Sequence, residues 1–174
     1  MSKAVMLSIR PKWAEKIANG EKTIEVRKTR PKLEPPFKCY IYCTPPKYPH
    51  EDFIATDYPM PQFYGGGKVI GEFTCDQIYE LAPLNHAPDD VEKQACLTRE
   101  EIVNYLKGTG YGWHIVDLRI YDMPRDLSEF RRATDPCDSC HAEYTWECTG
   151  CKKLSGDIKR APQSWCYVEA IDNG

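Results

Sequence analysis

Five short segments with the residue composition of β-strands are spread unevenly along the chain, and their spacing constrains the fold more than any other feature. They are rich in β-branched and aromatic residues and lie at residues 23–27, 38–44, 67–76, 113–121 and 165–171. A doubly wound parallel sheet needs a helix between successive strands, and this chain has no such regular alternation. The sequence therefore predicts an α+β fold, a small mixed β-barrel with two or more short helices.

Short helices are predicted at two places between these strands. Pro11 suits the first turn of a helix and Gly20 suits a left-handed stop, which predicts a helix over residues 11–19. Thr98 and Glu101 have the spacing of a capping box, which predicts the start of a second helix.

The length and composition of the chain are those of a single globular domain. We expect its 174 residues, 1–174, to form one domain, and its apolar and charged fractions are ordinary. No stretch approaches the ~18 consecutive apolar residues of a membrane-spanning helix. The apolar run before Arg10 is too short for a secretory signal. We therefore expect a cytoplasmic protein without a membrane partner, and the sequence leaves its oligomeric state open.

The charge of the chain is divided between its two ends. Residues 1–38 contain ten Lys and Arg residues and four Asp and Glu residues, a balance of +6, although the whole chain has a net charge of −3. The N-terminal part is therefore where an anionic partner is expected to bind.

Nine cysteines are present, an odd number that leaves one unpaired in any disulfide scheme. In a reducing compartment such clustered cysteines point to metal binding. Two CxxC turns, separated by seven residues, are formed by Cys137, Cys140, Cys148 and Cys151. They can place four thiolates around one divalent cation, so we expect a structural zinc in a cysteine knuckle over residues 135–155, inserted before the last strand.

Alternatives to this zinc site remain open. The gap between the two CxxC turns is short, so His141 or Cys166 could replace one ligand, or the turns could form a reduced surface hairpin without metal. A catalytic zinc is disfavoured, because four thiolates leave no open position for water. The remaining cysteines expected to be small buried residues are Cys39, Cys43, Cys75 and Cys96.

Charged residues of opposite sign come together over residues 20–27. In an extended strand Thr23, Glu25 and Arg27 share one face, and Lys22 lies in the preceding turn. Lys22 and Arg27 can contact phosphate, while Glu25 can accept a hydrogen bond from a base amino group and hold Arg27 in place. The alternative is an ion-pair lattice on the barrel surface, which contributes about 0–1 kcal/mol.

The same segment resembles the ASCH domain, a branch of the PUA-like β-barrel superfamily marked by a short helix and a G-x-K-x-x-E-x-R strand. The matching residues are Gly20, Lys22, Glu25 and Arg27. The order of helix and strands extends the resemblance over residues 4–121, and residues 165–171 would close the barrel. The resemblance implies a cleft beside the first helix that binds RNA or another nucleic acid.

Residues expected to contact this ligand lie on several segments. They are Ser8, Arg10, Lys22, Thr23, Glu25, Arg27, Tyr64, Trp113 and Trp165. Tyr64 ends a proline-rich loop over residues 45–66 that could act as a lid. Trp113 and Trp165 each begin a strand after a Gly or Ser, where an indole can stack on a base at the cleft mouth. Trp13, at helical spacing, is interpreted as a core residue.

Binding of RNA is the primary prediction, and two other functional classes remain open. Some ASCH proteins are amidohydrolases of acylated cytidine and others ribonucleases, which would make Lys22 and Glu25 catalytic, with Glu72 as a candidate second acid. The amidohydrolases place a threonine nucleophile where this chain has Glu25, and Thr23 is one step out of register. A third possibility is a protein-interaction domain built from the cysteine hairpin and residues 125–132.

The zinc hypothesis predicts that Cys148→Ser lowers the free energy of unfolding, because metal binding at a structural site is coupled to folding. Thermal unfolding of both proteins, with zinc content measured by mass spectrometry, checks this. A metal-free wild type, or a variant with unchanged melting temperature, would contradict the hypothesis.

Overall fold

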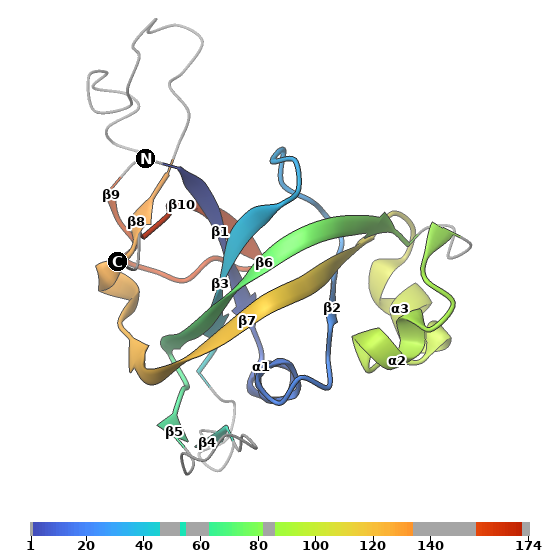
Figure 1. Cartoon of the computed structure of the whole chain (residues 1–174), viewed down its shortest axis with the longest axis horizontal. Coiled ribbons are helices and arrows are strands. Elements are labelled where there is room, and N and C mark those ends of the chain that lie inside the picture. The colour runs from blue at the N-terminus through green and yellow to red at the C-terminus, as the bar shows by residue number, and fades with distance from the viewer. Residues whose placement is uncertain (1, 46–52, 55–62, 82–85, 134–155, 172–174) are drawn as a thin grey trace, which may run out of the picture.

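A computed structural model describes residues 2–45, 53–54, 63–81, 86–133 and 156–171 of the chain. Eight strands form one sheet in the order β2-β7-β6-β3-β1-β10-β8-β9 (Figure 1). They are β1 (Lys3–Ile9), β2 (Ile24–Arg27), β3 (Phe37–Cys43), β6 (Lys68–Glu80), β7 (Tyr111–Arg125), β8 (Arg131–Arg132), β9 (Gly156–Asp157) and β10 (Trp165–Glu169). Neighbouring strands are antiparallel except for β1 and β3, which are parallel. The sheet and its helices confirm the predicted α+β class.

The first helix, α1 (Pro11–Ala18), confirms the helix predicted over residues 11–19. Pro11 occupies its first turn, while Ala14 and Ile17 are buried against the sheet. Gly20 follows with a φ of 74°, a left-handed conformation that glycine adopts without steric cost. This turn sends the chain directly into β2, so α1 and β2 lie side by side (Figure 1).

Strands β6 and β7 are longer than predicted, at 13 and 15 residues. Their pairing continues to Glu80 and Tyr111, where the chain leaves the sheet to form α2 (Val91–Ala95) and α3 (Arg99–Leu106). β2 pairs with this same end of β7. The two helices therefore lie beside β2 at one end of the molecule (Figure 1).

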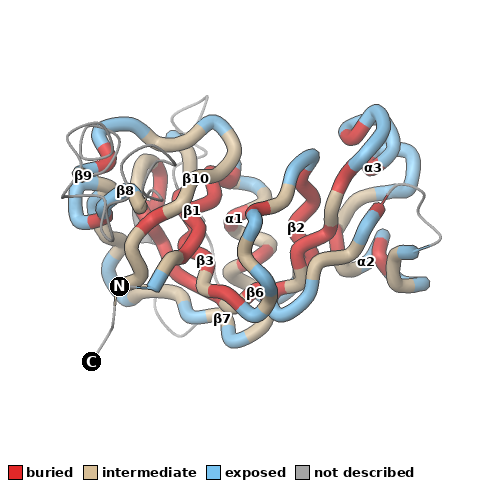
Figure 2. Tube along the Cα trace, turned by 90° about the horizontal axis from the view of Figure 1, so that it is seen from above, coloured by how far each residue is buried: buried red, intermediate tan, exposed pale blue. Residues whose placement is uncertain are grey.

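The helical segment is anchored to β2 by its own apolar cluster. Ile24 of β2 packs with Ile102 and Leu106 of α3, and all three are buried. Figure 2 shows buried positions along β2 and in the neighbouring helical segment. The predicted capping box is present: the Thr98 amide donates to Glu101 Oε2 at 2.8 Å, and the Glu101 amide donates to Thr98 Oγ1 at 3.2 Å. The position of α3 is thus fixed by its cap and by contacts with β2.

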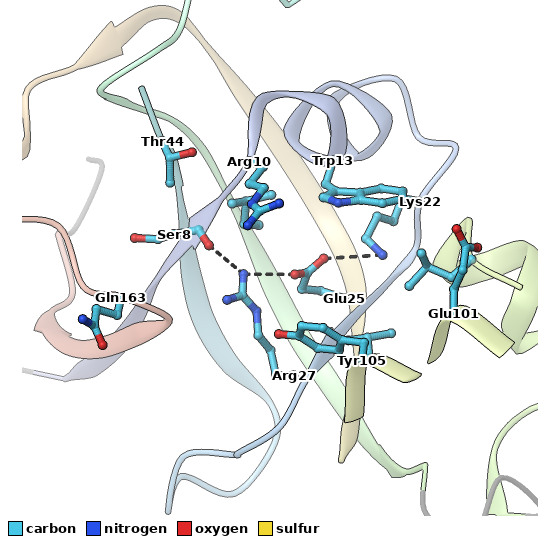
Figure 3. A pocket seen from close by; sticks show the side chains of 13 residues that line it. Ser8, Arg10, Trp13, Lys22, Glu25, Arg27, Thr44, Glu101, Tyr105 and Gln163 are labelled. Carbon is cyan, nitrogen blue, oxygen red and sulfur yellow. Dashed lines mark hydrogen bonds and ion pairs between the residues drawn. The ribbon is translucent and has the colours of Figure 1, made fainter. Parts of the chain in front are cut away.

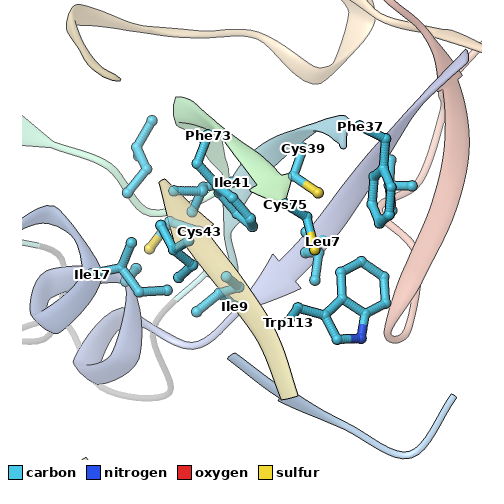
Figure 4. Packing of buried hydrophobic residues seen from close by; sticks show 14 residues of the cluster. Leu7, Ile9, Ile17, Phe37, Cys39, Ile41, Cys43, Phe73, Cys75 and Trp113 are labelled. Carbon is cyan, nitrogen blue, oxygen red and sulfur yellow. The ribbon is translucent and has the colours of Figure 1, made fainter. Parts of the chain in front are cut away.

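A second and larger apolar cluster fills the space between the central strands and α1. Leu7, Ile41, Phe73 and Trp113 are among its buried members (Figure 4). Phe37 packs edge-on against Trp113, with ring centroids 5.8 Å apart. A third cluster, around Tyr40 and Phe130, lies under β10 and the segment that follows β7.

Three of the four cysteines predicted to be small buried residues are completely buried, namely Cys39, Cys43 and Cys75. The prediction was wrong for Cys96, which is partly exposed. Cys96 ends α2 with a left-handed φ of 53°, and this turn holds its thiol near the surface, where Sγ lies 3.4 Å from the Glu21 carbonyl oxygen.

The last strand joins the first, as expected from residues 165–171. β10 pairs antiparallel with β1, where Trp165 lies opposite Leu7. Just before β10, the Ser164 carbonyl accepts a hydrogen bond from the Ser8 amide at 2.9 Å. Residues 125–132, the predicted protein-interaction segment, are partly built into the fold, since Phe130 is buried and β8 pairs with β10.

Part of the sequence prediction lies outside the described residues. This applies to the cysteine knuckle over residues 135–155, with Cys137, Cys140, Cys148 and Cys151, so the zinc site stays a prediction. Within the described part of the chain, no cluster of His, Cys, Asp and Glu has the grouping of a metal site.

No described helix is long and apolar enough to cross a membrane. The proline-rich loop contains one described pair of strands, β4 (Phe53–Ile54) with β5 (Phe63–Tyr64).

Candidate ligand pocket

A pocket of about 420 Å³ lies between α1, β2 and α3 (Figure 3). The first strand and the end of β3 form one wall, and the helical segment forms the opposite one. The lining residues are Ser8, Ile9, Arg10, Trp13, Lys22, Glu25, Val26, Arg27, Thr44, Leu97, Glu101, Tyr105 and Gln163. The pocket therefore opens where the sequence placed a cleft, beside the first helix.

The floor of this pocket is a buried ionic network centred on Glu25. Its Oε1 lies 3.0 Å from Nη2 of Arg27, and its Oε2 lies 3.5 Å from Nζ of Lys22. All three side chains are at least nine-tenths buried. Thr23 lies between these residues in sequence, and the extended backbone of β2 directs Glu25 and Arg27 to the same side, as predicted.

Lys22 is fixed by contacts within the protein. Its Nζ donates to the Ala95 carbonyl at 2.7 Å and lies 5.3 Å from the centre of the Trp13 ring. Burial removes water from the ammonium group and lowers the pKa of Lys22, although Glu25 partly offsets this effect. Lys22 therefore ties the turn before β2 to the end of α2.

Arg27 bridges β2, which lies at one edge of the sheet, to β1 and to the segment before β10. Its Nη2 donates to the Ser8 carbonyl at 2.8 Å, and its Nη1 lies 3.3 Å from the Ser164 carbonyl and 3.2 Å from the Ser164 hydroxyl. No strand pairing joins β2 to β1 among the described residues, so the Arg27 side chain makes this connection.

These contacts correct two interpretations of the sequence. The ion pairs do not form a surface lattice, since the three groups are buried. Lys22 and Arg27 are also poorly placed to contact phosphate, because most of their donors are directed to Glu25 and to backbone carbonyls.

Each oxygen of Glu25 is paired with one cation, and a carboxylate oxygen can accept two hydrogen bonds. The network therefore presents a fixed acceptor to the pocket.

Two aromatic residues flank this carboxylate. In Figure 3 the Trp13 indole lies on one side of Glu25 and the Tyr105 ring on the other. Trp13 is only partly buried, so its interpretation as a core residue is incomplete: the ring packs on the core and also lines the pocket. Tyr105 is 45% exposed on α3, with its ring open to a ligand.

Tyr105 was missed in the sequence analysis. The available signal was its spacing from Glu101, since residues four apart share one face of a helix, and both line the pocket. That spacing could not show that this face of α3 turns towards α1. Only the packing of α3 on β2 brings the two helices to opposite sides of one pocket.

Five of the nine predicted contact residues line the pocket: Ser8, Arg10, Lys22, Glu25 and Arg27. The Ser8 hydroxyl donates to the Pro162 carbonyl at 2.6 Å. The side chain of Tyr64 lies outside the described residues. The remaining three predicted residues lie elsewhere.

Thr23, Trp113 and Trp165 are therefore corrections. The Thr23 hydroxyl donates to Oε1 of Gln94 at 3.2 Å, since the turn before β2 directs it towards α2. Trp113 is completely buried, because its indole lies in the apolar core cluster and packs against the Phe37 and Trp165 rings. The Trp165 indole packs towards Trp113 and donates to the Thr29 hydroxyl at 2.9 Å, so it closes the core instead of the pocket.

Glu72, the candidate second acid, also lies outside the pocket. It accepts a hydrogen bond from the Tyr121 hydroxyl at 2.7 Å and lies 3.4 Å from Lys38 Nζ. These contacts place it on the opposite side of the sheet from the network, near the cluster around Tyr40. Glu25 is thus the buried carboxylate of this pocket, and Glu101 is an exposed one at its rim.

Comparison with known proteins identifies the family to which the chain belongs. A family model of the ASCH domain matches residues 7–155. The chain belongs to the ASCH family. This ASCH domain also resembles the ASCH protein from Zymomonas mobilis, with a TM-score of 0.57, 17% sequence identity, and coverage of 95% of this chain and 87% of that chain. A single-site mutant of that protein gives a TM-score of 0.58 at 17% identity, covering 97% and 91%. These likenesses show the shared fold, and a search of curated proteins finds no match.

The buried network predicts a large effect of removing its only anion. Glu25→Gln leaves Lys22 and Arg27 as buried cations without a countercharge, so the free energy of unfolding should fall by about 3 kcal/mol or more. Urea denaturation of the ASCH domain measures this change. Glu21→Gln is the matched control, since Glu21 pairs with Lys16 at the surface and its loss should change stability by less than about 1 kcal/mol. Equal stability of the two variants would contradict the account of the network.

Proposed function

We propose that this ASCH domain binds RNA and that its pocket holds one unpaired base. The observation that supports this proposal most directly is the position of the buried Glu25 carboxylate between the Trp13 and Tyr105 rings. Proteins that recognise single-stranded RNA stack splayed bases on aromatic rings and bind the base edges through hydrogen bonds. The pocket offers both kinds of contact.

The chemistry of Glu25 suits a base edge better than a phosphate. An ionised carboxylate only accepts hydrogen bonds and repels the negative charge of phosphate. It can accept from an exocyclic amino group or a ring N–H, as glutamate does from the amino group of cytosine. Because Lys22 and Arg27 hold both oxygens, this acceptor needs no reorganisation when the base enters.

The size of the pocket supports a single nucleotide. About 420 Å³ lies near the lower end of the ~300–1,000 Å³ typical of small-ligand pockets. A base in a duplex could not reach Glu25, because this carboxylate lies on the pocket floor and its side chain is only 9% exposed. The proposal therefore specifies unpaired RNA.

Hydrolysis of a modified nucleoside or of RNA is less well supported. Such a mechanism needs a nucleophile and a proton donor near the substrate. The Thr23 hydroxyl is directed to Gln94, Ser8 donates to Pro162, and Glu72 is outside the pocket. Turnover of acylated cytidine or cleavage of RNA by the purified protein would show that the pocket is catalytic after all.

Stacking predicts that Trp13 and Tyr105 both contribute to RNA affinity. Tyr105→Ala should weaken the binding of a single-stranded oligonucleotide about tenfold, because stacking of a base on an aromatic ring contributes roughly 1–3 kcal/mol. Trp13→Leu should have a similar effect, with some apolar packing retained. Fluorescence anisotropy with single- and double-stranded RNA and DNA measures these affinities.

Val103→Ala serves as the control for these substitutions. Val103 lies on the same helix, is 53% exposed and does not line the pocket, so its loss should leave affinity unchanged. The proposal fails if the wild type binds none of the four nucleic acids, or if Tyr105→Ala binds as tightly as Val103→Ala.

A further inference from the structure

The mouth of the pocket carries exposed cations that the buried network does not use. Arg10 lines the mouth next to α1, and Lys12 is exposed on the first turn of that helix. The Lys12 ammonium lies 4.8 Å from the centre of the Trp13 ring. On the other side, Lys28 is exposed just after β2, and its ammonium lies 5.3 Å from the centre of the Tyr105 ring.

Each of the two stacking rings therefore has an exposed lysine beside it. None of Arg10, Lys12 and Lys28 takes part in an ion pair between residues that the structure describes. This is the opposite of Lys22 and Arg27, whose charges are engaged inside the protein. The cations near the pocket thus form two sets, a buried set that holds Glu25 and an exposed set at the rim.

We infer that the exposed set forms a phosphate track, in which Arg10 and Lys12 contact the phosphate on one side of the inserted nucleotide and Lys28 contacts the phosphate on the other. This inference rests on the proposed insertion of a base. It specifies the ligand as an internal nucleotide of a single strand, because a free nucleoside lacks both phosphates and a terminal nucleotide lacks one of its flanking linkages.

The geometry of the mouth supports a continuous strand. Trp13 and Tyr105 lie on opposite sides of Glu25 in Figure 3, so their lysines mark two sides of the base position. A strand that crosses the mouth passes both lysines with its backbone outside and one base inside. Exposed ammonium groups bind phosphate by charge, and this contact tolerates any sequence.

One negative group at the rim opposes this track. Glu101 lines the mouth and is exposed, and one of its carboxylate oxygens accepts from the Thr98 amide in the capping box. These hydrogen bonds lower the pKa of Glu101, and nearby Lys12 adds a smaller effect in the same direction. Glutamine also forms capping boxes, so Glu101→Gln removes the charge while preserving the helix cap.

Binding of short ligands to the purified protein tests the track. The ligands are a free nucleoside, a trinucleotide with two phosphodiester linkages and the same trinucleotide with two neutral methylphosphonate linkages. The phosphodiester trinucleotide should bind at least roughly tenfold tighter than the other two, since only it carries both charges. A nucleoside or neutral trinucleotide that binds as tightly as the charged one overturns the track.

Salt dependence assigns the contacts to residues. Lys12→Ala and Lys28→Ala should each reduce the slope of log affinity against log salt by about 0.7, the value for one phosphate contact of a single strand. Arg119→Ala is the control, because Arg119 is an exposed cation on β7 that does not line the pocket and, among the described cation–ring contacts, lies over neither the Trp13 nor the Tyr105 ring. Glu101→Gln should act in the opposite sense and tighten binding.

The outcomes separate this inference from the function on which it rests. If the nucleoside binds and Lys12→Ala and Lys28→Ala behave like Arg119→Ala, the track is wrong and the base pocket remains. If neither nucleoside nor oligonucleotide binds, the proposed function fails, and the track fails with it. Reduced slopes in both lysine variants, with an unchanged slope for Arg119→Ala, support the track.

Discussion

The placement of two cations and one anion in a site nearly closed to water is the constraint on which this structure depends. Lys22 and Arg27 are stabilised there because Glu25 lies between them and backbone carbonyls accept from most of their remaining donors, although Arg27 Nε has no hydrogen-bond partner among the described residues. Through these contacts Lys22 ties β2 to α2, and Arg27 ties β2 to β1 and to the segment before β10. The network therefore joins the helical segment, the edge strand β2 and the interior strand β1 at the floor of the pocket.

This arrangement divides the charged groups between two tasks. The buried cations position Glu25 and have few donors left for a ligand, while Arg10 is exposed at the pocket and Lys12 and Lys28 are exposed beside the Trp13 and Tyr105 rings. A negatively charged nucleic-acid strand would be attracted to these exposed cations. Inside the pocket, a base would meet aromatic rings and the hydrogen-bond acceptor Glu25. Under the proposed function, the base would enter the pocket and the phosphates would stay at the exposed cations, although the net charge of the whole protein is −3.

Local sequence signals predicted the elements that local chemistry determines. Pro11 and Gly20 gave the bounds of α1, Thr98 and Glu101 gave the cap of α3, and alternation in β2 placed Glu25 and Arg27 on one face. The misplaced residues depend on long-range packing. Trp113 follows a glycine at the predicted start of a strand, and only its packing against Phe37 and Trp165 in the core cluster buries it. The burial of the network and the approach of Tyr105 to Trp13 likewise arise from tertiary packing that periodicity cannot show.

We propose that one base enters the pocket and lies between the two rings. Intermolecular nuclear Overhauser effects between isotope-labelled protein and an unlabelled single-stranded RNA test it most directly. If the base lies there, the base protons of a single nucleotide will show contacts to both the Trp13 indole and the Tyr105 ring. Binding that persists without any contact between a base proton and these rings would contradict it.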